Sequence, residues 1–551
     1  MSVLEQPLEY RRLAAPRENR GLLLDPPATD ISEHIRRNIS LREQTSADVD
    51  LHGRTLEELS RTLRRQFISA AIEYTRSYRD VDAVTLETAA SSSAGDAPVL
   101  LAGHQPDLFH PGVWCKNFAL SRLAEKNGAT AINLLIDSDA VKKTRVRTPG
   151  GTLESPTLTP VAFDDLPPAN VAYEEYSIAN RELFDSFAPR VCEAISALVP
   201  SPLVETFWPR AIERANANGL LGLSLAQSRH QLEGEWGAKT LELPQSTVCQ
   251  LEGFHYFTAH LLANLPRFFE VYNEAVHEYR RVNHIRSAAH PVPDLHTEDS
   301  YLEAPFWIWD AEDRERRRLF VRDEGEELRL TDRRHIDIRI AASPDGELDL
   351  ATEQLAALTC RGIKIRTRAL ATTMFARLLL GDLFIHGIGG AKYDTLTDAL
   401  LRRFFGLEPP EFVAASATLH LPVEHPQRSS NTTARVQQQL RNLVYHPETA
   451  LKESEIAVDP QLREQAELKR RWVETVQTIE NGKTRCRAIR SANEAMQPYV
   501  EGLRLELLAE GEQILAGIRS ERILSSREYE FCLFPAEQLQ AFLLDYLPAR
   551  L

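Results

Sequence analysis

Residues 98–139 read PVLLAGHQPDLFHPGVWCKNFALSRLAEKNGATAINLLIDSD, and this stretch sets the expected architecture. An apolar run, Pro98–Ala102, ends at Gly103, and a second apolar run, Ala131–Ile136, ends at Asp137. Between the two runs apolar residues recur at helical spacing, so the pattern predicts a strand, a loop, a helix and a second strand. Two strands joined by a helix run parallel. We therefore expect an α/β fold that binds ligands at the carboxyl ends of its parallel strands.

Polar residues follow both predicted strands and are the first candidate site residues. Gly103, His104 and Gln105 come after the first strand, and Asp137 and Asp139 come after the second. His104 is suited to stabilise or protonate a leaving phosphate because its charge changes near neutral pH; the alternative is a histidine that caps the loop by hydrogen bonding. The two aspartates are suited to hold Mg²⁺ or contact a ribose, or, without any ligand, to cap a helix or form a turn.

A second stretch, residues 361–406, has a similar pattern: RGIKIRTRALATTMFARLLLGDLFIHGIGGAKYDTLTDALLRRFFG. The apolar run Leu383–His386 predicts a strand, and a helix is expected from about Thr395. Glycines permit positive φ and close approach of a ligand, and a helix N-terminus attracts anions, so a binding loop is predicted here; the alternative is a tight turn. The stretch matches neither the Walker A motif nor the G-x-G-x-x-G fingerprint. The candidate cofactor-binding residues are His386, Gly387, Gly389 and Gly390.

Basic residues occur at two further places. Arg366 and Arg368 lie at the end of another predicted strand, Ile363–Arg366, where they either bind an anionic substrate or form surface ion pairs. Directly after the aspartates the chain carries a basic run in an otherwise acidic protein. A solvated loop is the default interpretation of this run, and steering of anions is the alternative. The run consists of Lys142, Lys143, Arg145 and Arg147.

Size and composition exclude several classes of protein. At 551 residues the chain is expected to form two or three domains, and its 43% hydrophobic and 26% charged residues are typical of a globular protein. The net charge of −15 argues against a general nucleic-acid binder. The six cysteines include no CxxC pair, so neither a zinc ribbon nor a disulfide framework is indicated. Residues 1–13 lack the apolar core of a signal peptide and no apolar run reaches membrane-spanning length, so we expect a cytoplasmic protein without membrane contact.

The expected organisation has four parts. A helical hairpin or coiled coil near the C-terminus is predicted from helical spacing of apolar residues, with a break at Asn481-Gly482, and would suit a homodimer. The parts are an N-terminal helical appendage (1–95), an α/β core (96–410) with largely helical connecting segments at about 175–345, a connecting segment (411–458), and the C-terminal hairpin and tail (459–551).

Several blocks, in this order, resemble segments of one enzyme family. Gly103–Gly112, followed by Lys116, is similar to the Gly-Gln-Gln…Leu-Phe…Gly-Pro…Lys-Ala segment of the cysteine-adding enzymes of bacillithiol biosynthesis (the BshC family). Leu134–Asp139 stands where that family has a strand ending in Ser-Glu-Asp-His, and Arg361–Pro410 resembles its Leu-Arg-Pro strand, helix, and strand ending in Gly-Gly-Pro-x-Glu. Leu533–Pro535 resembles its closing Leu-Phe-Pro.

The sequence also departs from the family at three places. His104 replaces a glutamine, Ala140 stands at the family's histidine, and Ala391-Lys392 replace the Pro-x-Glu region. The resemblance implies a Rossmann-like, nucleotidyltransferase-like parallel-sheet core with helical insertions and a C-terminal coiled coil. It also implies an enzyme that joins an amino or thiol compound to a small acceptor. Because of the departures, cysteine ligation itself is an open expectation.

The resulting hypothesis is a ligase or group-transfer enzyme that binds ATP or ADP, with the need for Mg²⁺ left open. His104 would act on a leaving phosphate, the glycines would donate N–H groups, and Asp137 or Asp139 would position a ribose, a metal or the amine nucleophile. The alternatives are a non-catalytic dimeric scaffold on the same fold and a nucleotide-sugar transferase. A metal hydrolase is disfavoured because the sequence has no HExxH motif.

Overall fold

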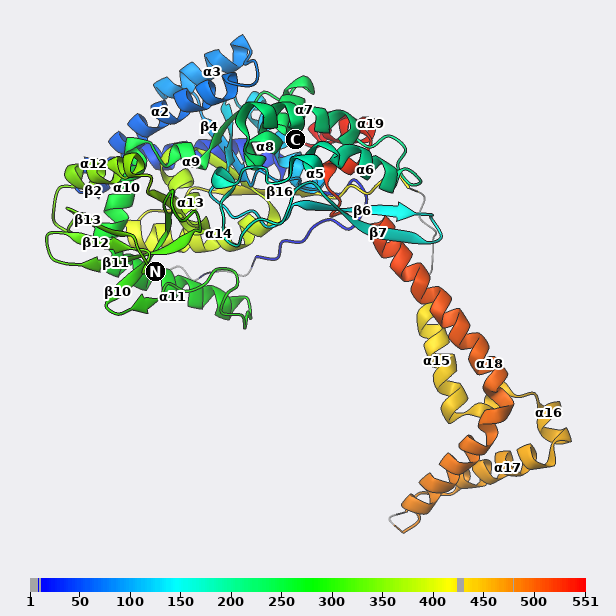
Figure 1. Ribbon diagram of the computed structural model, residues 1–551. Helices are drawn as coiled ribbons and strands as arrows, with labels where there is room; N and C mark the ends of the chain where they lie inside the picture. The colour runs from blue at the N-terminus through cyan, green and yellow to red at the C-terminus, as the bar shows by residue number, and fades with distance from the viewer. Residues whose placement is uncertain (1–7, 9–10, 424–430, 479) are drawn as a thin grey trace. The chain divides into compact units, whose positions relative to one another are not determined.

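A computed structural model describes residue 8 and residues 11–423, 431–478 and 480–551 (Figure 1). The chain divides into a main unit, Met1–Thr148 with Thr159–Pro422 and Arg527–Leu551, and a helical unit, Pro149–Leu158 with Val423–Ser526. The expectation that the chain lacks a signal peptide rests on residues 1–13. Of these, residues 1–7 lie outside the described residues. No helix in the described ranges combines the length and the apolar composition needed to cross a membrane.

The main unit is organised around a mixed, mostly parallel sheet, here called the main sheet. Its order is β1-β16-β15-β4-β5-β8, with β1 antiparallel to β16 and the other pairs parallel. From β4 the chain adds β5 and β8 on one side and later β15 and β16 on the other, so the order reverses between β4 and β15. The strands are β1 (Leu22–Asp25), β4 (Val99–His104), β5 (Thr130–Leu135), β8 (Leu241–Pro244), β15 (Leu383–His386) and β16 (Phe412–Ala417).

The central strands are mostly apolar and do not alternate, because helices cover both faces of the sheet. In β4, Val99 and Leu101 belong to one hydrophobic cluster, and Leu100 and Ala102 belong to another on the opposite face. The first face is covered by α2 (Leu56–Arg76) and the second by α1 (Ala28–Thr45) and α4 (Pro111–Lys126). Continuous apolar runs, rather than alternating ones, are the pattern that the sequence carries at 98–102 and 131–136, and the predicted α/β class is confirmed.

The N-terminal segment is part of this core rather than an appendage. Leu22–Asp25 pairs with β16 and so completes one edge of the main sheet. Ile31 and Ile35 of α1 are fully buried against it, while α3 (Ala83–Ala94) packs on α2. The sequence alone indicated helices here but not their burial, because four residues of edge strand have too short a pattern to read.

A second sheet of the main unit is antiparallel. Its order is β13-β12-β11-β10-β14, with β9 paired to β10. The strand predicted at Ile363–Arg366 exists as β14, but it pairs with β10 of this second sheet and not with the main sheet. The strands are β9 (Thr297–Glu298), β10 (Tyr301–Trp309), β11 (Arg317–Asp323), β12 (Leu328–Thr331), β13 (Asp337–Ile340) and β14 (Lys364–Thr367).

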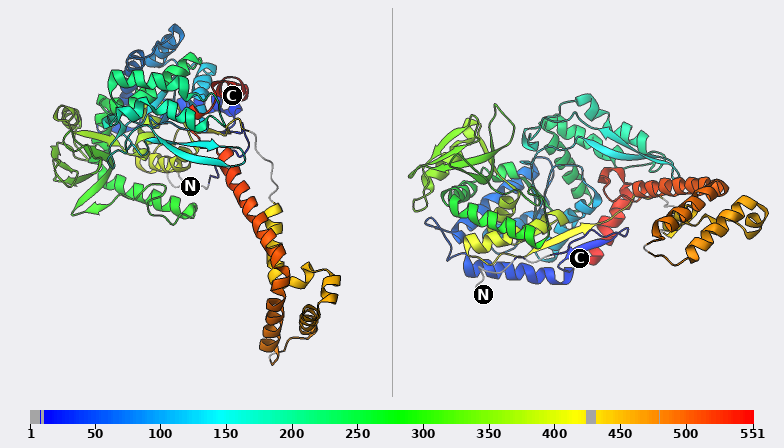
Figure 2. Two further views of the ribbon diagram at one scale, coloured as in Figure 1. Left: turned by 45° about the vertical axis from the view of Figure 1, so that its right-hand side comes forward. Right: turned by 90° about the horizontal axis from the view of Figure 1, so that it is seen from below.

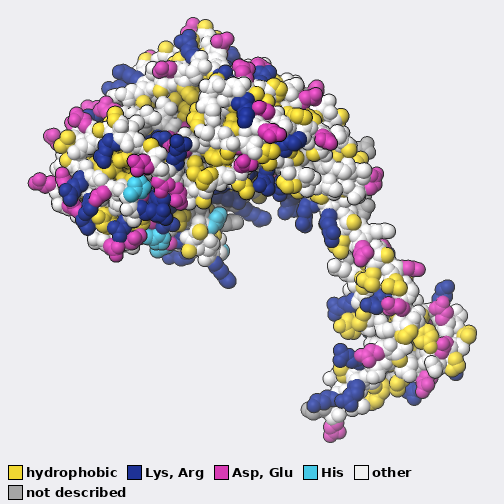
Figure 3. Space-filling model, viewed as in Figure 1, with side chains coloured by type: hydrophobic (Ala, Val, Ile, Leu, Met, Phe, Trp, Pro, Cys, Tyr) yellow, Lys and Arg dark blue, Asp and Glu magenta, His cyan; other side chains and the backbone are white. Residues whose placement is uncertain are grey.

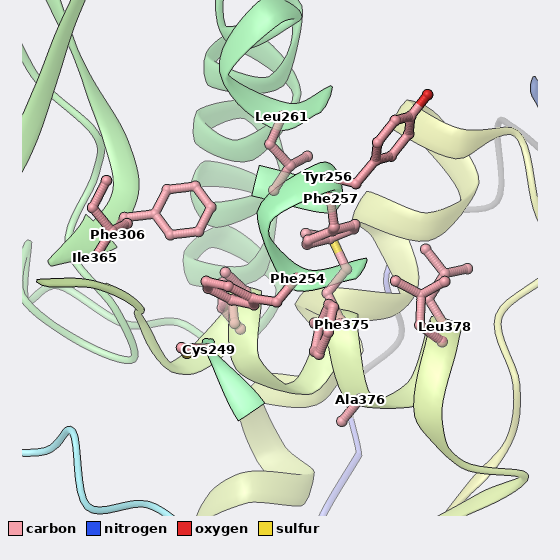
Figure 4. Close-up of a cluster of buried hydrophobic side chains, with 14 of the residues drawn as sticks. Cys249, Phe254, Tyr256, Phe257, Leu261, Phe306, Ile365, Phe375, Ala376 and Leu378 are labelled. Atoms are coloured by element: carbon pink, nitrogen blue, oxygen red, sulfur yellow. The ribbon is translucent and has the colours of Figure 1, made fainter. Parts of the chain in front are cut away.

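Aromatic packing joins this sheet to the helices beside it. Two successive helices, α10 (Glu252–Ala263) and α11 (Leu265–Val282), are separated at Asn264, and Pro266 lies in the first turn of α11. Figure 4 shows Phe254 and Phe257 of α10 around Phe375 of α13, with ring centroids 5.4 and 5.2 Å from that of Phe375. The remaining helices of the main unit are α5 (Arg181–Asp185), α6 (Phe187–Ile195), α7 (Val204–Asn218), α8 (Leu221–Glu235), α9 (Gln245–Val248), α12 (Asp349–Ala357), α13 (Ala369–Phe375), α14 (Ile388–Leu400) and α19 (Ala536–Gln540).

The helical unit contains the predicted hairpin. α17 (Pro460–Glu474) packs against α18 (Gly482–Leu524), and α18 begins at the predicted break. α15 (Asn431–Tyr445) also packs on α18, α16 (Glu453–Val458) precedes α17, and Figure 2 gives two further views of these helices. Residues 527–551, expected as a tail of the hairpin, instead belong to the main unit. Short strands complete the chain: β2 (Asp50–Leu51), β3 (Arg54–Thr55), β6 (Arg145–Gly151) and β7 (Pro156–Ala162).

Candidate functional site

The candidate site lies at the carboxyl edge of the main sheet. Strands β4 and β15 are parallel neighbours with Ala102 opposite Ile385, so the two stretches identified in the sequence do meet, as predicted. Strand β5 pairs with β4 on the other side. The loops that follow β4 and β5 are joined directly, because Gln105 Nε2 donates a hydrogen bond of 2.7 Å to Asp139 Oδ2. Polar residues from three strand ends are therefore neighbours at one edge.

Asp137 is a buried carboxyl that titrates near neutral pH. Its side chain is 2% exposed, and Oδ1 accepts a hydrogen bond of 2.9 Å from the Ser246 backbone N–H while Oδ2 accepts one from the Ser246 hydroxyl. Burial, and then the nearby Glu174 carboxylate, raise the pKa of Asp137 to about 7. A carboxyl group with a pKa near the working pH is suited to accept and release protons.

Asp139 differs from Asp137 in its ionisation. Burial opposes its ionisation, but the hydrogen bond from Gln105 and the charges of Lys142 and Arg316 hold the pKa of Asp139 below its usual value. Arg316 Nη1 lies 3.3 Å from Asp139 Oδ1. Two carboxyl groups at one edge thus have pKa values shifted in opposite directions, an arrangement that separates a proton acceptor from a permanent negative charge.

His104 fits the loop-capping alternative and not the predicted role of proton donor. Its side chain is buried, with Nδ1 3.1 Å from the Gln105 carbonyl and Nε2 3.3 Å from Asn117 Nδ2. Because an amide nitrogen donates, Nε2 accepts and Nδ1 carries the proton. Burial and the charges of Arg229 and Lys116 lower the pKa of His104 well below its usual value, so the ring is neutral at pH 7.

Gly103 and Lys116 also have structural contacts at this edge. Lys116 is 3% exposed and donates a hydrogen bond of 2.8 Å to the Gly103 carbonyl. A Cβ at Gly103 would lie 3.3 Å from the Phe384 ring, so packing favours glycine here. Burial lowers the pKa of Lys116 to about 8. Neither residue presents its polar group to a ligand in this arrangement.

Arg366, predicted to bind an anion, is instead paired inside the protein. It is 4% exposed, and its Nε and Nη2 donate to the two carboxylate oxygens of Glu174, each at 2.9 Å. The Glu174 backbone N–H in turn donates 2.9 Å to the Asp137 carbonyl. A bidentate buried pair leaves the guanidinium no free face for a ligand. Arg366 therefore orders the segment beside Asp137 rather than binding a cofactor.

The predicted glycine loop is a helix N-terminus. Strand β15 ends at His386 and α14 begins at Ile388, seven residues earlier than expected, so Gly387 (φ −77°) is the N-cap and Gly389 lies in the first turn. None of the three glycines needs a positive φ. The N-cap has no side-chain hydrogen bond, and a Cβ at Gly387 or Gly389 would meet no atom within 4 Å. The first turn of α14 therefore has no side-chain cap, and Gly389 in it is exposed.

His386 and Gly390 hold this helix in place. A Cβ at Gly390 would lie 2.8 Å from His386 Nδ1, so only glycine fits there. His386 is 4% exposed, with Nε2 2.9 Å from Asp394 Oδ2, and Asp394 also pairs with Arg377 at 2.6 Å. His386 is therefore a structural contact between β15 and α14 and not a cofactor ligand.

Three further polar residues belong to this site and were missed in the sequence. Gln245 and Ser246 follow β8 directly, so the rule that found the other strand ends applies to them. Glu174 lies in a connecting segment with no periodic pattern, so only the fold places it beside Asp137.

A cavity of about 430 Å³ opens beside the loop that follows β4, and we call it the loop cavity. Its lining in the described residues includes none of the residues of β15 or α14 and not Asp137. Lys143 lies in it 3.6 Å from Asp107 and 3.2 Å from Glu530. The lining residues are His104, Gln105, Asp107, Leu108, Phe109, His110, Val113, Lys143, Arg145, Arg147, Glu528 and Glu530.

Across residue 8 and the ranges 11–423, 431–478 and 480–551, no three His, Cys, Asp or Glu side chains are grouped so as to hold a metal ion. Comparison with known proteins finds no protein family whose model matches this sequence and no matching curated protein. The functional argument therefore rests on the geometry of the sheet edge.

Proposed function

We propose that this protein is an enzyme that binds ATP or ADP at the carboxyl edge of the main sheet and joins an amino or thiol compound to a small acceptor, by ligation or group transfer. The supporting observation is the reversal of strand order between β4 and β15, followed at once by the N-terminus of α14, which has no side-chain cap. The five parallel strands have the order found in Rossmann-like sheets, which bind nucleotides at such a reversal. Free N–H groups and the helix dipole favour phosphate there.

The aspartates have separate roles in this proposal. Asp137, with its pKa of about 7, accepts the proton that the amine or thiol nucleophile loses on attack. Asp139 stays ionised and, through its bond from Gln105, fixes the loop after β4. Mg²⁺ stays outside the proposal because Arg316 and Gln105 already engage the two carboxylate oxygens of Asp139.

Equilibrium binding of ADP and ATP, with and without Mg²⁺, tests the proposal, and Gly389→Asp locates the site. A side chain at this position meets no neighbouring atom, and an aspartate in the first turn favours the helix, so the variant is expected to fold. Its carboxylate covers the N–H groups and repels phosphate, so we expect affinity to fall about tenfold or more. Gly389→Ala, which adds no charge, is the matched control and should bind as the wild type. Absence of nucleotide binding, or equal binding by Gly389→Asp, would refute the proposal.

One observation favours self-association as well, as the scaffold alternative requires. Four large apolar side chains of α18 are 41–58% exposed within the helical unit, where Figure 3 shows yellow side chains at the surface: Leu505, Leu508, Leu515 and Ile518. We propose that they pack against a second copy of the chain. Light scattering after gel filtration should give a dimer that Leu508→Lys converts to a monomer. Glu506→Lys, on an exposed polar position away from the apolar face of the same helix, should leave the dimer intact. A monomeric wild type would refute it, without bearing on catalysis.

A further inference from the structure

The basic run that follows the aspartates has no part in the proposed nucleotide site, and the structure places it on the loop cavity. Arg145 and Arg147 belong to β6 and both line the cavity, while Val146 between them is 1% exposed. Alternate residues of a strand project from the same face, so the two guanidinium groups lie on one wall. Lys142, which does not line the cavity and whose side chain is 74% exposed, fits the interpretation as a solvated loop. Arg145 and Arg147 are exposed as well, but both line a cavity.

The charges around the cavity are unevenly matched. Lys143 is shared between Asp107 and Glu530, so these two carboxyl groups and one ammonium largely balance one another. Burial raises the pKa of Asp107 to about 6, so at pH 7 this carboxyl group keeps most of its negative charge for Lys143. By contrast, Arg145 and Arg147 have no carboxylate at ion-pairing distance within the described part of the chain. A third carboxylate of the lining, Glu528, lies 3.7 Å from His110 and 3.7 Å from Arg527. Arg145 and Arg147 therefore line the cavity without a carboxylate paired directly to either of them.

The rest of the lining limits what the cavity can hold. Its volume of about 430 Å³ is in the range of small-molecule sites. Leu108, Phe109 and Val113 provide an apolar surface opposite the polar residues. A small organic molecule with one anionic end fits this combination better than a free inorganic ion, which would leave the apolar surface unused.

We infer that the loop cavity binds the oxyanion group, phosphate or carboxylate, of a small organic molecule through Arg145 and Arg147. His104 and Gln105 line the cavity and also belong to the sheet edge, so the bound molecule lies against that edge. Its assignment as the acceptor substrate, separate from the nucleotide, rests on the proposed function. The oxyanion site itself does not.

Titration calorimetry of the full chain with inorganic phosphate and with succinate at pH 7 tests the inference. We expect millimolar or tighter binding of at least one probe, weakened about a hundredfold in Arg145→Ala/Arg147→Ala, because each guanidinium contributes roughly tenfold. Arg463→Ala/Arg470→Ala, two exposed arginines of α17, removes the same charge elsewhere and should bind as the wild type. Binding of phosphate alone identifies a phosphorylated ligand, and binding of succinate alone identifies a carboxylic acid.

Three results would overturn the inference: binding of neither probe, undiminished binding in the double variant, or equal weakening in the control. Circular dichroism confirms that both variants are folded. Nucleotide binding is measured separately. If ADP binds the wild type and the double variant equally, the acceptor assignment is supported; if the double variant loses ADP, the cavity is the nucleotide's own site and that assignment fails. If ADP does not bind at all, the proposed function fails while probe binding at Arg145 and Arg147 still stands.

Discussion

Replacing Asp137 with asparagine should make the protein more stable at alkaline pH. Asparagine has nearly the same shape as aspartate and still accepts the hydrogen bond from the Ser246 backbone N–H. The Ser246 hydroxyl can turn to accept from the new amide. The substitution therefore removes the buried negative charge while it keeps the packing and the hydrogen bonds.

The size of the effect follows from the pKa. In the folded chain the pKa of Asp137 is about 7, against an unperturbed value of 3.8. Between these values the native state holds a proton that the unfolded state has lost, so the stability of the wild type falls as pH rises. At 1.36 kcal/mol per pKa unit, a shift of about 3 units costs about 4 kcal/mol by pH 8. Asparagine does not titrate and avoids this cost, so the gain should be near zero at pH 4 and largest above pH 7.

Urea-induced unfolding at pH 4.5 and at pH 8 measures this difference. Asp139→Asn is the control with the opposite sign: the pKa of Asp139 is lowered, so loss of its charge should destabilise the protein at pH 8. A gain from Asp137→Asn smaller than about 1 kcal/mol at pH 8, or one that does not change with pH, would refute the reasoning. If turnover is found, the same variant should lose it, because it cannot accept a proton.

Three further predictions follow from the burial and pairing of particular side chains. Asp382→Ala leaves two buried or half-buried arginines without their shared carboxylate and should cost about 3–5 kcal/mol in urea unfolding, whereas a loss below 1 kcal/mol would show that the pairs contribute little. In the native protein the exposed thiols of Cys360 and Cys486 should react rapidly with Ellman's reagent, while Cys115, whose pKa burial raises to about 12, should react only after unfolding. The ring carbons of His104 should show no titration between pH 5.5 and 8 by NMR with labelled histidine, and a midpoint in that interval would contradict the neutral ring.

The central strands, and the parallel pairing of the two that one helix connects, could be predicted because the information is local. An apolar run without alternation indicates a strand buried on both faces, and the helix between Gly103 and Ala131 makes the two strands it connects parallel. The same pattern at Leu383–His386 indicated another strand of this kind. A common site at one edge of the sheet requires this strand, β15, to lie beside β4, and the structure confirms that the two strands are parallel neighbours.

The state of the site residues could not be predicted in the same way. His104, Arg366 and His386 were chosen for their chemistry, and each proves to be engaged by a buried partner that is distant in sequence: Asn117, Glu174 and Asp394 are not neighbours that a pattern can assign. A polar residue near a strand end is free for a ligand only if no such partner reaches it. Asp137 and the first turn of α14 at Gly389 are in part free of such partners. His104, Arg366 and His386 are not.

The sequence by itself determined the α/β class, the central strands, the helical hairpin and the edge of the sheet at which polar residues gather. All of these depend on apolar spacing and on residues that are adjacent along the chain. Tertiary structure alone decided that β14 joins the second sheet, that β1 closes the main sheet, and that Arg145 and Arg147 face a cavity. The physical reason is that strand pairing, burial and charge compensation depend on contacts between distant segments. Such contacts set the pKa of Asp137 and the pairing of Arg366. The residue types alone do not determine either property, because they are the same in the unfolded chain, where these contacts are absent.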